Sequence, residues 1–161
     1  MVDRRLRICA EAKPAWFDAH NQIAGAARIL APNIVPGILG IGDNLAPAPS
    51  LAQAWVWEDD RTLRLDLAHD RRFSSGRPVS PQAVIENLER PMAERGSVFN
   101  AHEFSVIGEC SAVSESSLVL RLKQPFAPLP GVLANGFGIV DLHQGLPPQN
   151  TQGAGPQTPR R

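Results

Sequence analysis

Residues 55–67 read WVWEDDRTLRLDL, and this stretch decides the fold class. Within residues 62–67, leucines alternate with charged residues, which is typical of an antiparallel strand with one buried and one solvated face. A tryptophan-rich run, residues 55–57, comes before it, and the acidic residues 58–60 with Arg61 between the two runs indicate a turn. The stretch therefore predicts a β-hairpin.

A turn-rich segment leads from this hairpin into a predicted helix. Ser80 is a good N-cap, because its hydroxyl can accept a hydrogen bond from a free backbone N–H of the first turn. Pro81 suits the first helical position, where its missing N–H would be unpaired anyway. Val84 and Leu88 then fall on one helical face. We expect Pro91 to end the helix, because proline removes a backbone donor and clashes with the preceding turn.

The downstream sequence returns to strand patterns. Residues 104–107, 109–113 and 118–122 predict three more strands, with a turn at residues 114–116 between the last two. Residues 131–140 are apolar and predict a short helix followed by a strand. Together with the hairpin, these segments predict a small antiparallel β subdomain that packs against the capped helix.

The upstream sequence predicts a further sheet and helix. Residues 6–10 indicate a short strand, and Asp18 can cap a helix that Pro32 should end. Residues 34–41 are apolar but broken by proline and glycines, which favours a short buried strand plus a bend. Residues 43–50 are rich in proline and alanine and predict a loop. The expected fold class is therefore mixed α/β, of the α+β kind.

Composition excludes several classes of function. The 161 residues include 16 basic and 16 acidic side chains, so the formal net charge is zero. Because nucleic-acid binding needs a surplus of Lys and Arg on one face, no nucleic-acid partner is predicted. No apolar run approaches the ~20 residues that span a bilayer. Residues 1–6 are charged with no apolar run behind them, so we predict no secretory signal and a cytoplasmic location for the chain as written. Cys9 and Cys110 are interpreted as small core residues.

The sequence offers little chemistry. Residues 37–42 contain a Gly-x-Gly, but Leu45 stands where a dinucleotide-binding loop needs its third glycine, so no cofactor is predicted. The four histidines are scattered and lack the spacing of a metal site. Asp18 with His20 could form an acid–base pair, but a helix cap and a first-turn residue explain the two better. The sequence therefore predicts neither an enzyme nor a metal site.

Five segments of the chain resemble sequence motifs of a known protein family. They are residues 11–20 (EAKPAWFDAH), 33–39 (NIVPGIL), 49–55 (PSLAQAW), 59–90 (DDRTLRLDL through GRPVS to LER) and 118–129 (LVLRLKQPFAPL). In this order and at these spacings they resemble the motifs of the family 5 bacterial extracellular solute-binding proteins, the dipeptide-, oligopeptide- and nickel-binding type. The resemblance covers residues 6–140 and only the opening part of a family member.

The resemblance implies an incomplete lobe of the periplasmic-binding-protein-like type II fold. It implies a substrate-binding component of an ABC importer for peptides or similar small solutes, with ABC permease subunits as partners and a periplasmic location. In a complete protein, the ligand would lie in a cleft between two lobes that closes by hinge motion. The resemblance places Asn33, Val35 and Pro36 near this cleft as candidate substrate-binding residues. The family has Tyr-Glu where this chain has Val35-Pro36, so a hydroxyl and a carboxylate are lost there.

We expect the chain to divide into two parts. Residues 1–140 would form the N-terminal part of a solute-binding domain, and residues 141–161 a disordered or non-native tail, because apolar periodicity vanishes there. One hypothesis is that the tail is out-of-frame or truncated sequence. Two other interpretations stay open, namely a cytoplasmic ligand-sensing domain of a regulator and a non-functional gene remnant. Neighbouring permease and ATPase genes would favour import, whereas an upstream DNA-binding domain would favour regulation.

Overall fold

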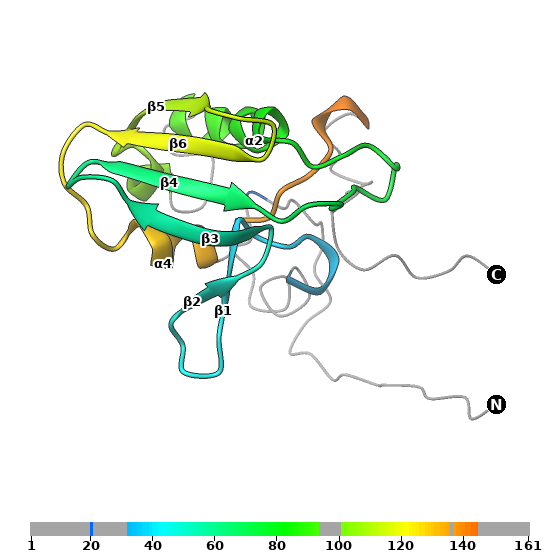
Figure 1. Cartoon of the computed structure of the whole chain (residues 1–161), viewed down its shortest axis with the longest axis horizontal. Coiled ribbons are helices and arrows are strands. Elements are labelled where there is room, and N and C mark those ends of the chain that lie inside the picture. Colours follow the sequence, from blue (N-terminus) through cyan, green and yellow to red (C-terminus); the bar gives the residue numbers. More distant parts are fainter. Residues whose placement is uncertain (1–19, 21–31, 94–100, 136, 145–161) are drawn as a thin grey trace.

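The computed structural model describes residues 20, 32–93, 101–135 and 137–144 (Figure 1). Within these residues, a four-stranded antiparallel sheet has the order β3-β4-β6-β5, and a two-stranded ribbon is formed by β1 and β2. The strands are β1 Leu39–Ile41, β2 Pro47–Pro49, β3 Ala52–Trp57, β4 Thr62–Leu67, β5 Ile107–Ala112 and β6 Ser117–Leu122. The helices are α2 Pro81–Ala93, α3 Ala101–Phe104 and α4 Leu129–Ala134, and a 3-10 turn, η1, covers Leu142–Gln144. The expected mixed α/β fold class is confirmed.

The hairpin predicted from residues 55–67 is strands β3 and β4. Its turn is closed by two backbone donors: Arg61 N donates to Asp59 Oδ1 at 2.7 Å, and Glu58 N donates to the Thr62 carbonyl at 2.9 Å. An aspartate that accepts from the backbone two residues on is a common way to stabilise a tight turn. The local sequence therefore sets the register of the hairpin.

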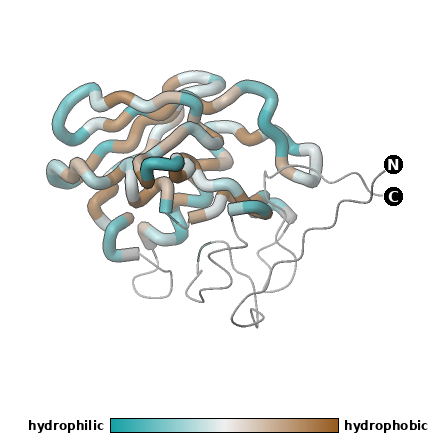
Figure 2. Tube along the Cα trace, turned by 90° about the horizontal axis from the view of Figure 1, so that it is seen from below, coloured by the Kyte–Doolittle hydropathy of each residue, from teal (hydrophilic) through white to brown (hydrophobic). Residues whose placement is uncertain are grey.

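Leucines of two neighbouring strands build the centre of the core. In the register of β4 and β6, Leu63 lies opposite Leu120 and Leu65 opposite Leu118, and all four side chains are fully buried. Figure 2 shows hydrophobic residues along the strands and hydrophilic residues in the outer loops. Helix α2 covers the buried face of this sheet (Figure 1) and contributes Val84 to the core. Cross-strand apolar pairs of this kind are a main source of sheet stability.

Helix α2 begins as the sequence predicts and ends later than expected. Ser80 Oγ accepts a hydrogen bond from Ala83 N at 3.3 Å, which confirms the N-cap, and Pro81 is the first helical residue. The helix does not end at Pro91 but continues to Ala93. Because Pro91 stands in the last turn, it removes only one ladder hydrogen bond so close to the end of the helix.

Two other expectations are wrong. Residues 104–107 do not form a strand: Phe104 ends helix α3, and strand β5 begins at Ile107. Residues 43–50 are not all loop, because β2 pairs with β1 in a register that places Gly40 opposite Ala48. Gly42 N donates to the Ala46 carbonyl at 2.9 Å. In the alternation of an antiparallel ladder, both prolines of β2 then fall where the N–H faces away from β1, so their missing donors cost nothing.

Several expectations fall on the ends of the chain. The strand at residues 6–10, the Asp18 cap and Cys9 lie outside the described residues. Residues 32–34 are helical, so the chain is helical beyond Pro32, where we expected the helix to end. The short helix within residues 131–140 is confirmed as part of α4, but the strand after it is reduced to two isolated bridge residues, Gly138, which pairs with Gly37, and Val140.

Candidate ligand-binding cavity

A cavity of about 430 Å³ lies between the segment that leads into β1 and the segment that follows α4. Its described lining is Pro32, Val35, Pro36, Gly37, Leu39, Gly40, Ile41, Ser50, Ala134, Asn135, Phe137 and Gly138. Small-molecule sites in proteins have volumes of ~300–1,000 Å³ and mostly apolar walls with a few polar groups. The cavity fits this description, with Ser50 and Asn135 supplying polar side chains.

Two glycines bring the walls of the cavity together. Gly37 and Gly138 form an antiparallel bridge, and Ile139 N donates to the Pro36 carbonyl at 3.1 Å. A Cβ on Gly37 would lie 2.7 Å from the Leu39 carbonyl oxygen, and a Cβ on Gly138 would lie 2.8 Å from the Val35 Cβ. Such distances are too short for any other residue. The glycines therefore allow two segments far apart in the sequence to lie side by side.

The structure places two of the three predicted substrate-binding residues at this cavity. Val35 and Pro36 both line it, although Val35 is only 2% exposed. Asn33 is exposed and is not among the lining residues. The opposite wall, Phe137 and Gly138, was missed, because neither residue belongs to a periodic pattern. The repeated glycines in this stretch were the only available signal.

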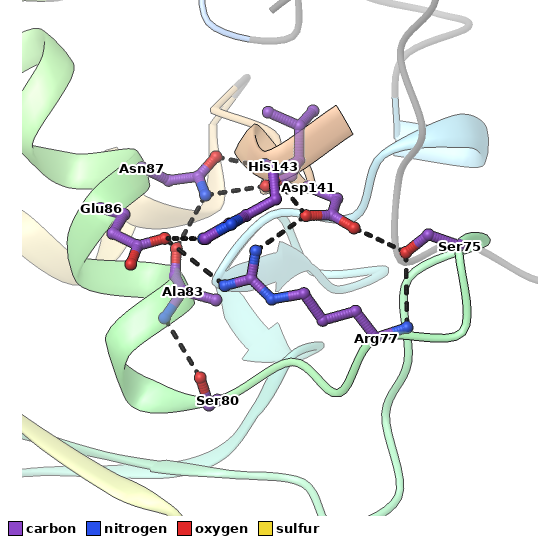
Figure 3. A network of polar contacts seen from close by, with 9 residues as sticks. Ser75, Arg77, Ser80, Ala83, Glu86, Asn87, Asp141 and His143 are labelled. Carbon is purple, nitrogen blue, oxygen red and sulfur yellow. Dashed lines mark hydrogen bonds and ion pairs between the residues drawn. The ribbon is translucent and has the colours of Figure 1, made fainter. Parts of the chain in front are cut away.

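The wall opposite Val35 is held by Asn87 of helix α2 (Figure 3). The Asn87 carboxamide donates from Nδ2 to the carbonyls of Ala83 at 2.8 Å and Val140 at 2.9 Å. Its Oδ1 accepts from Val140 N at 2.9 Å. Both backbone groups of Val140 are thus paired with one side chain that is 1% exposed. A buried carboxamide with its hydrogen-bonding groups paired in this way fixes its partner rigidly.

His20 packs behind the same wall. Its ring stacks on Phe137, with centroids 4.5 Å apart and an interplanar angle of 10°. Nε2 lies 2.9 Å from Asn87 Oδ1. Because Oδ1 can only accept, Nε2 carries the hydrogen, and Nδ1 is then the acceptor for Arg90 Nη1 at 3.4 Å. His20 is therefore a buried, hydrogen-bonded histidine, where the sequence analysis interpreted it as a first-turn helical residue.

A charged network, also drawn in Figure 3, connects Asp141 to Ser75 and Arg77, which precede α2 in the chain. Asp141 accepts from Ser75 Oγ at 2.6 Å, from Arg77 Nη1 at 2.9 Å and from His143 N at 3.2 Å. Arg77 also contacts Glu86, with Nη2 and Oε2 3.5 Å apart. Burial raises the pKa of Asp141, but the hydrogen bonds from Ser75, His143 and Arg77 outweigh it and leave the pKa below its ordinary value. Asp141, assigned from sequence to the tail, is thus buried and fully engaged in the fold.

Reactive groups are scarce in the part of the chain that the structure describes. No three His, Cys, Asp or Glu side chains there are grouped so that they could hold a metal ion. Burial, with smaller contributions from Glu89 and Glu109, raises the pKa of the Cys110 thiol to about 12. Such a thiol is a poor nucleophile, because the thiolate is the reactive form. What the described site offers is a mostly apolar cavity with a few polar groups.

The fold is similar to that of solved solute-binding proteins. The chain is similar to PBP AgaA of A. tumefaciens R10, solved with agropinic acid, with a TM-score of 0.81 and 23% identity over 89% of this chain and 30% of AgaA. It is also similar to the oligopeptide-binding protein AppA of Bacillus subtilis, solved with a nonapeptide, with a TM-score of 0.76 and 12% identity over 86% and 28% of the two chains. The fold is therefore that of part of a type II periplasmic binding protein.

The sequence defines the family within this class. Residues 46–157 match the model of the bacterial extracellular solute-binding proteins, family 5 Middle, and the chain belongs to this family. Among its curated relatives, the probable D,D-dipeptide-binding periplasmic protein DdpA of Escherichia coli K12 is 31% identical over 66% of this chain and 22% of DdpA. The glutathione-binding protein GsiB of the same strain is 23% identical over 74% of this chain and 23% of GsiB.

The extent of these matches bears on the domain boundaries. The chain spans less than a third of the length of these relatives and solved structures. The family match continues to residue 157, across most of the segment that the sequence analysis assigned to a tail. Residues 145–161 lie outside the described residues, so a disordered or non-native tail there stays a prediction. In the described ranges, no helix is both long and apolar enough to cross a membrane.

Proposed function

We propose that this chain supplies one ligand-facing wall of the substrate-binding component of an ABC importer, and that the ligand is a peptide or a similar small solute. The observation that carries the proposal is the cavity, where Val35 and Pro36 meet Phe137 and Gly138. These two predicted residues were selected from the family motif alone. A cavity formed at their position, in a chain that belongs to a solute-binding family, supports a binding role.

The ligand class follows from the relatives. Their names describe binding of glutathione and of D,D-dipeptides, and the similar structures hold a nonapeptide or agropinic acid. All are compact or extended organic solutes with amide or carboxylate groups. An apolar wall with backbone and small polar groups suits such ligands, because it buries their carbon skeleton and leaves a few hydrogen bonds to fix orientation.

In this proposal the chain binds and releases its ligand without making or breaking a bond. A second lobe would complete the cleft, and ABC permease subunits would receive the ligand from the closed form, in the periplasm. Hinge closure around a ligand is the established switching mode of two-lobed binding proteins. On this lobe, the candidate ligand contacts are Val35 and Pro36. Asn33 would contact the ligand only where a second lobe completes the cleft.

Ligand titration followed by NMR tests the proposal. The full 161-residue chain, labelled with ¹⁵N, would be titrated separately with trialanine, glutathione and nickel chloride. We expect a peptide to shift the amide signals of Val35, Gly37 and Gly138, while signals of the distant β5 and β6 strands stay in place. Peptides that leave every signal around the cavity unchanged, at concentrations that saturate weak sites, would contradict the proposal.

A further inference from the structure

The cavity wall made by Phe137 and Gly138 continues into Ile139 and Val140, which do not line the cavity, and these four residues belong to no helix and no extended strand. On one side it is held by the bridge between Gly138 and Gly37 and by the hydrogen bond from Ile139 N to the Pro36 carbonyl. A segment with so little regular structure needs other contacts to stay in one place. Among the described residues, Phe104 packs against Phe137, with ring centroids 4.8 Å apart, and Asn87 and His20 supply contacts that include hydrogen bonds.

Asn87 takes the place that a neighbouring strand would have. Its carboxamide pairs with both the N–H and the carbonyl of Val140, at 2.9 Å each, and so copies the two hydrogen bonds of an antiparallel pair. The second Nδ2 hydrogen goes to the Ala83 carbonyl one helical turn earlier, which fixes the side chain to α2. Helix α2 therefore sets the position of the wall through one side chain.

His20 adds the second support. Its ring lies flat against Phe137, and Phe137 lines the cavity. The ring is oriented by its Nε2–H, which donates to the same Asn87 Oδ1 that accepts from Val140 N. Histidine and asparagine thus form one buried unit, 1% exposed at each residue, that contacts the segment 137–140 at its lining residue Phe137 and at Val140, two residues beyond the lining residue Gly138.

We propose that Asn87 and His20 are positioning residues of the ligand cavity: Asn87 fixes Val140, His20 backs Phe137, and the pair sets the shape of the wall that the ligand meets. This inference rests on the proposed function, because it takes the cavity as the ligand site. It assigns a part in binding to helix α2, none of whose residues line the cavity among those described. Misplacing a binding group by about 1 Å can cost as much as ~100-fold in function, so loss of the unit should be felt at the ligand.

Substitution of Asn87 tests the inference, with hydrogen exchange and trialanine binding as the two measurements. In Asn87→Ala, we expect the amides of Ile139 and Val140 to exchange at least tenfold faster than in the unaltered chain, beyond any change in the amides of β4 and β6. We also expect the affinity for trialanine to fall at least tenfold. Asn87→Asp should behave similarly, because a carboxylate cannot donate to the carbonyls of Ala83 and Val140.

The matched control is Leu122→Ala in β6, which removes a buried side chain from the core without touching the wall. It should speed exchange evenly across the molecule and leave trialanine affinity unchanged while the chain is folded. His20→Phe provides a milder variant that keeps a flat ring against Phe137 but loses the Nε2 donor. We expect it to lower affinity less than Asn87→Ala does.

The outcomes separate the two proposals. Trialanine binding at equal affinity in the unaltered chain and in Asn87→Ala would overturn the positioning role and leave the proposed function intact. The same conclusion follows if the exchange rates of the Ile139 and Val140 amides rise only as much as those of the β4 and β6 amides. A chain that binds trialanine nowhere near the cavity, with or without the substitution, would overturn the ligand site itself.

Discussion

Gly138 lies so close to Val35 that any side chain at residue 138 would enter the space of the valine: an added Cβ would stand 2.8 Å from Val35 Cβ and 3.0 Å from its Cγ2. Valine is branched at Cβ and has no flexible end to move aside. We therefore expect Gly138→Ala to force the two cavity walls apart and to lower the free energy of unfolding by about 1–3 kcal/mol. Urea unfolding followed by tryptophan fluorescence measures this.

Gly131 provides the control for this substitution. It lies within helix α4, and an added Cβ there would meet no atom within 4 Å. Because alanine favours the helix over glycine, Gly131→Ala should raise the free energy of unfolding by up to about 1 kcal/mol. Equal destabilisation by both substitutions would show that the close approach of Gly138 and Val35 is not what makes glycine necessary.

We expect Asp141 to make the free energy of unfolding depend on pH in the acid range. Its pKa is held below the ordinary value, because hydrogen bonds from Ser75, His143 and Arg77 outweigh the effect of burial. A depressed folded-state pKa gives stability that is present above the unfolded-state pKa and is lost as the pH falls through the folded-state pKa. We expect Asp141→Asn to lower the free energy of unfolding at neutral pH by about 1–3 kcal/mol. The difference from the unaltered chain should shrink in acid.

The pH series can be checked against an exposed carboxylate. Asp60 has a side chain that is 71% exposed, and Asp60→Asn should change stability by less than about 0.5 kcal/mol at neutral pH. Urea unfolding curves of both variants, measured from neutral pH downward, give the comparison. A constant gap between Asp141→Asn and the unaltered chain at every pH would rule out the acid dependence.

Cys110 should resist alkylation in the folded chain. Burial, followed in size by Glu89 and Glu109, raises its pKa from 9.0 to about 12, so the thiolate fraction at mildly alkaline pH falls by about a thousandfold. Iodoacetamide labelling with mass spectrometry of the Cys110 peptide measures the rate separately from Cys9. We expect labelling in concentrated urea to be faster by orders of magnitude. Rapid labelling of the folded chain would mean that strand β5 opens readily.

The cap of helix α2 offers a test of the predicted helix start. Ser80→Ala removes the acceptor for Ala83 N and should cost about 0.5–1 kcal/mol of stability, at the lower end of cap effects because the hydrogen bond is long at 3.3 Å. Ser80→Asp keeps an acceptor at this position and should retain most of the stability. Thermal unfolding by circular dichroism distinguishes the two variants. A loss in both would indicate that Ser80 acts through another contact.

Much of the sheet could be predicted from sequence, because its signals are local. The alternation in residues 62–67 sets which side chains of β4 face inward, and Asp59 closes the turn within the same stretch. Ser80 and Pro81 likewise mark the start of α2 through contacts within one turn. The error at β2 has a structural cause: this strand is two prolines around Ala48, and its pairing depends on which backbone groups face β1, a property that no residue preference encodes.

Only one of the two cavity walls contained residues that were predicted from the sequence. Val35 and Pro36 were found from a motif, but Phe137 and Gly138 come from a distant segment that shows no periodicity. The buried places of Asn87 and Asp141 could not be predicted either, because polar residues are normally exposed. Their partners lie 53 and 66 residues away, Val140 for Asn87 and Ser75 for Asp141. Long-range hydrogen bonds of this kind become visible only when the chain has been folded.

Those same separations have a consequence for the order in which the fold assembles. The β3–β4 and β5–β6 hairpins join neighbouring segments, whereas the polar contacts of Asn87 and Asp141 close loops of more than fifty residues. Long loops cost entropy before their contacts form, so the two hairpins should form first, and the β4–β6 pairing and the docking of residues 137–144, which both close long loops, should follow. Substitutions at Asn87 or Asp141 would then accelerate unfolding and leave the rate of folding nearly unchanged. The cavity is accordingly a feature that forms after the hairpins and not with them.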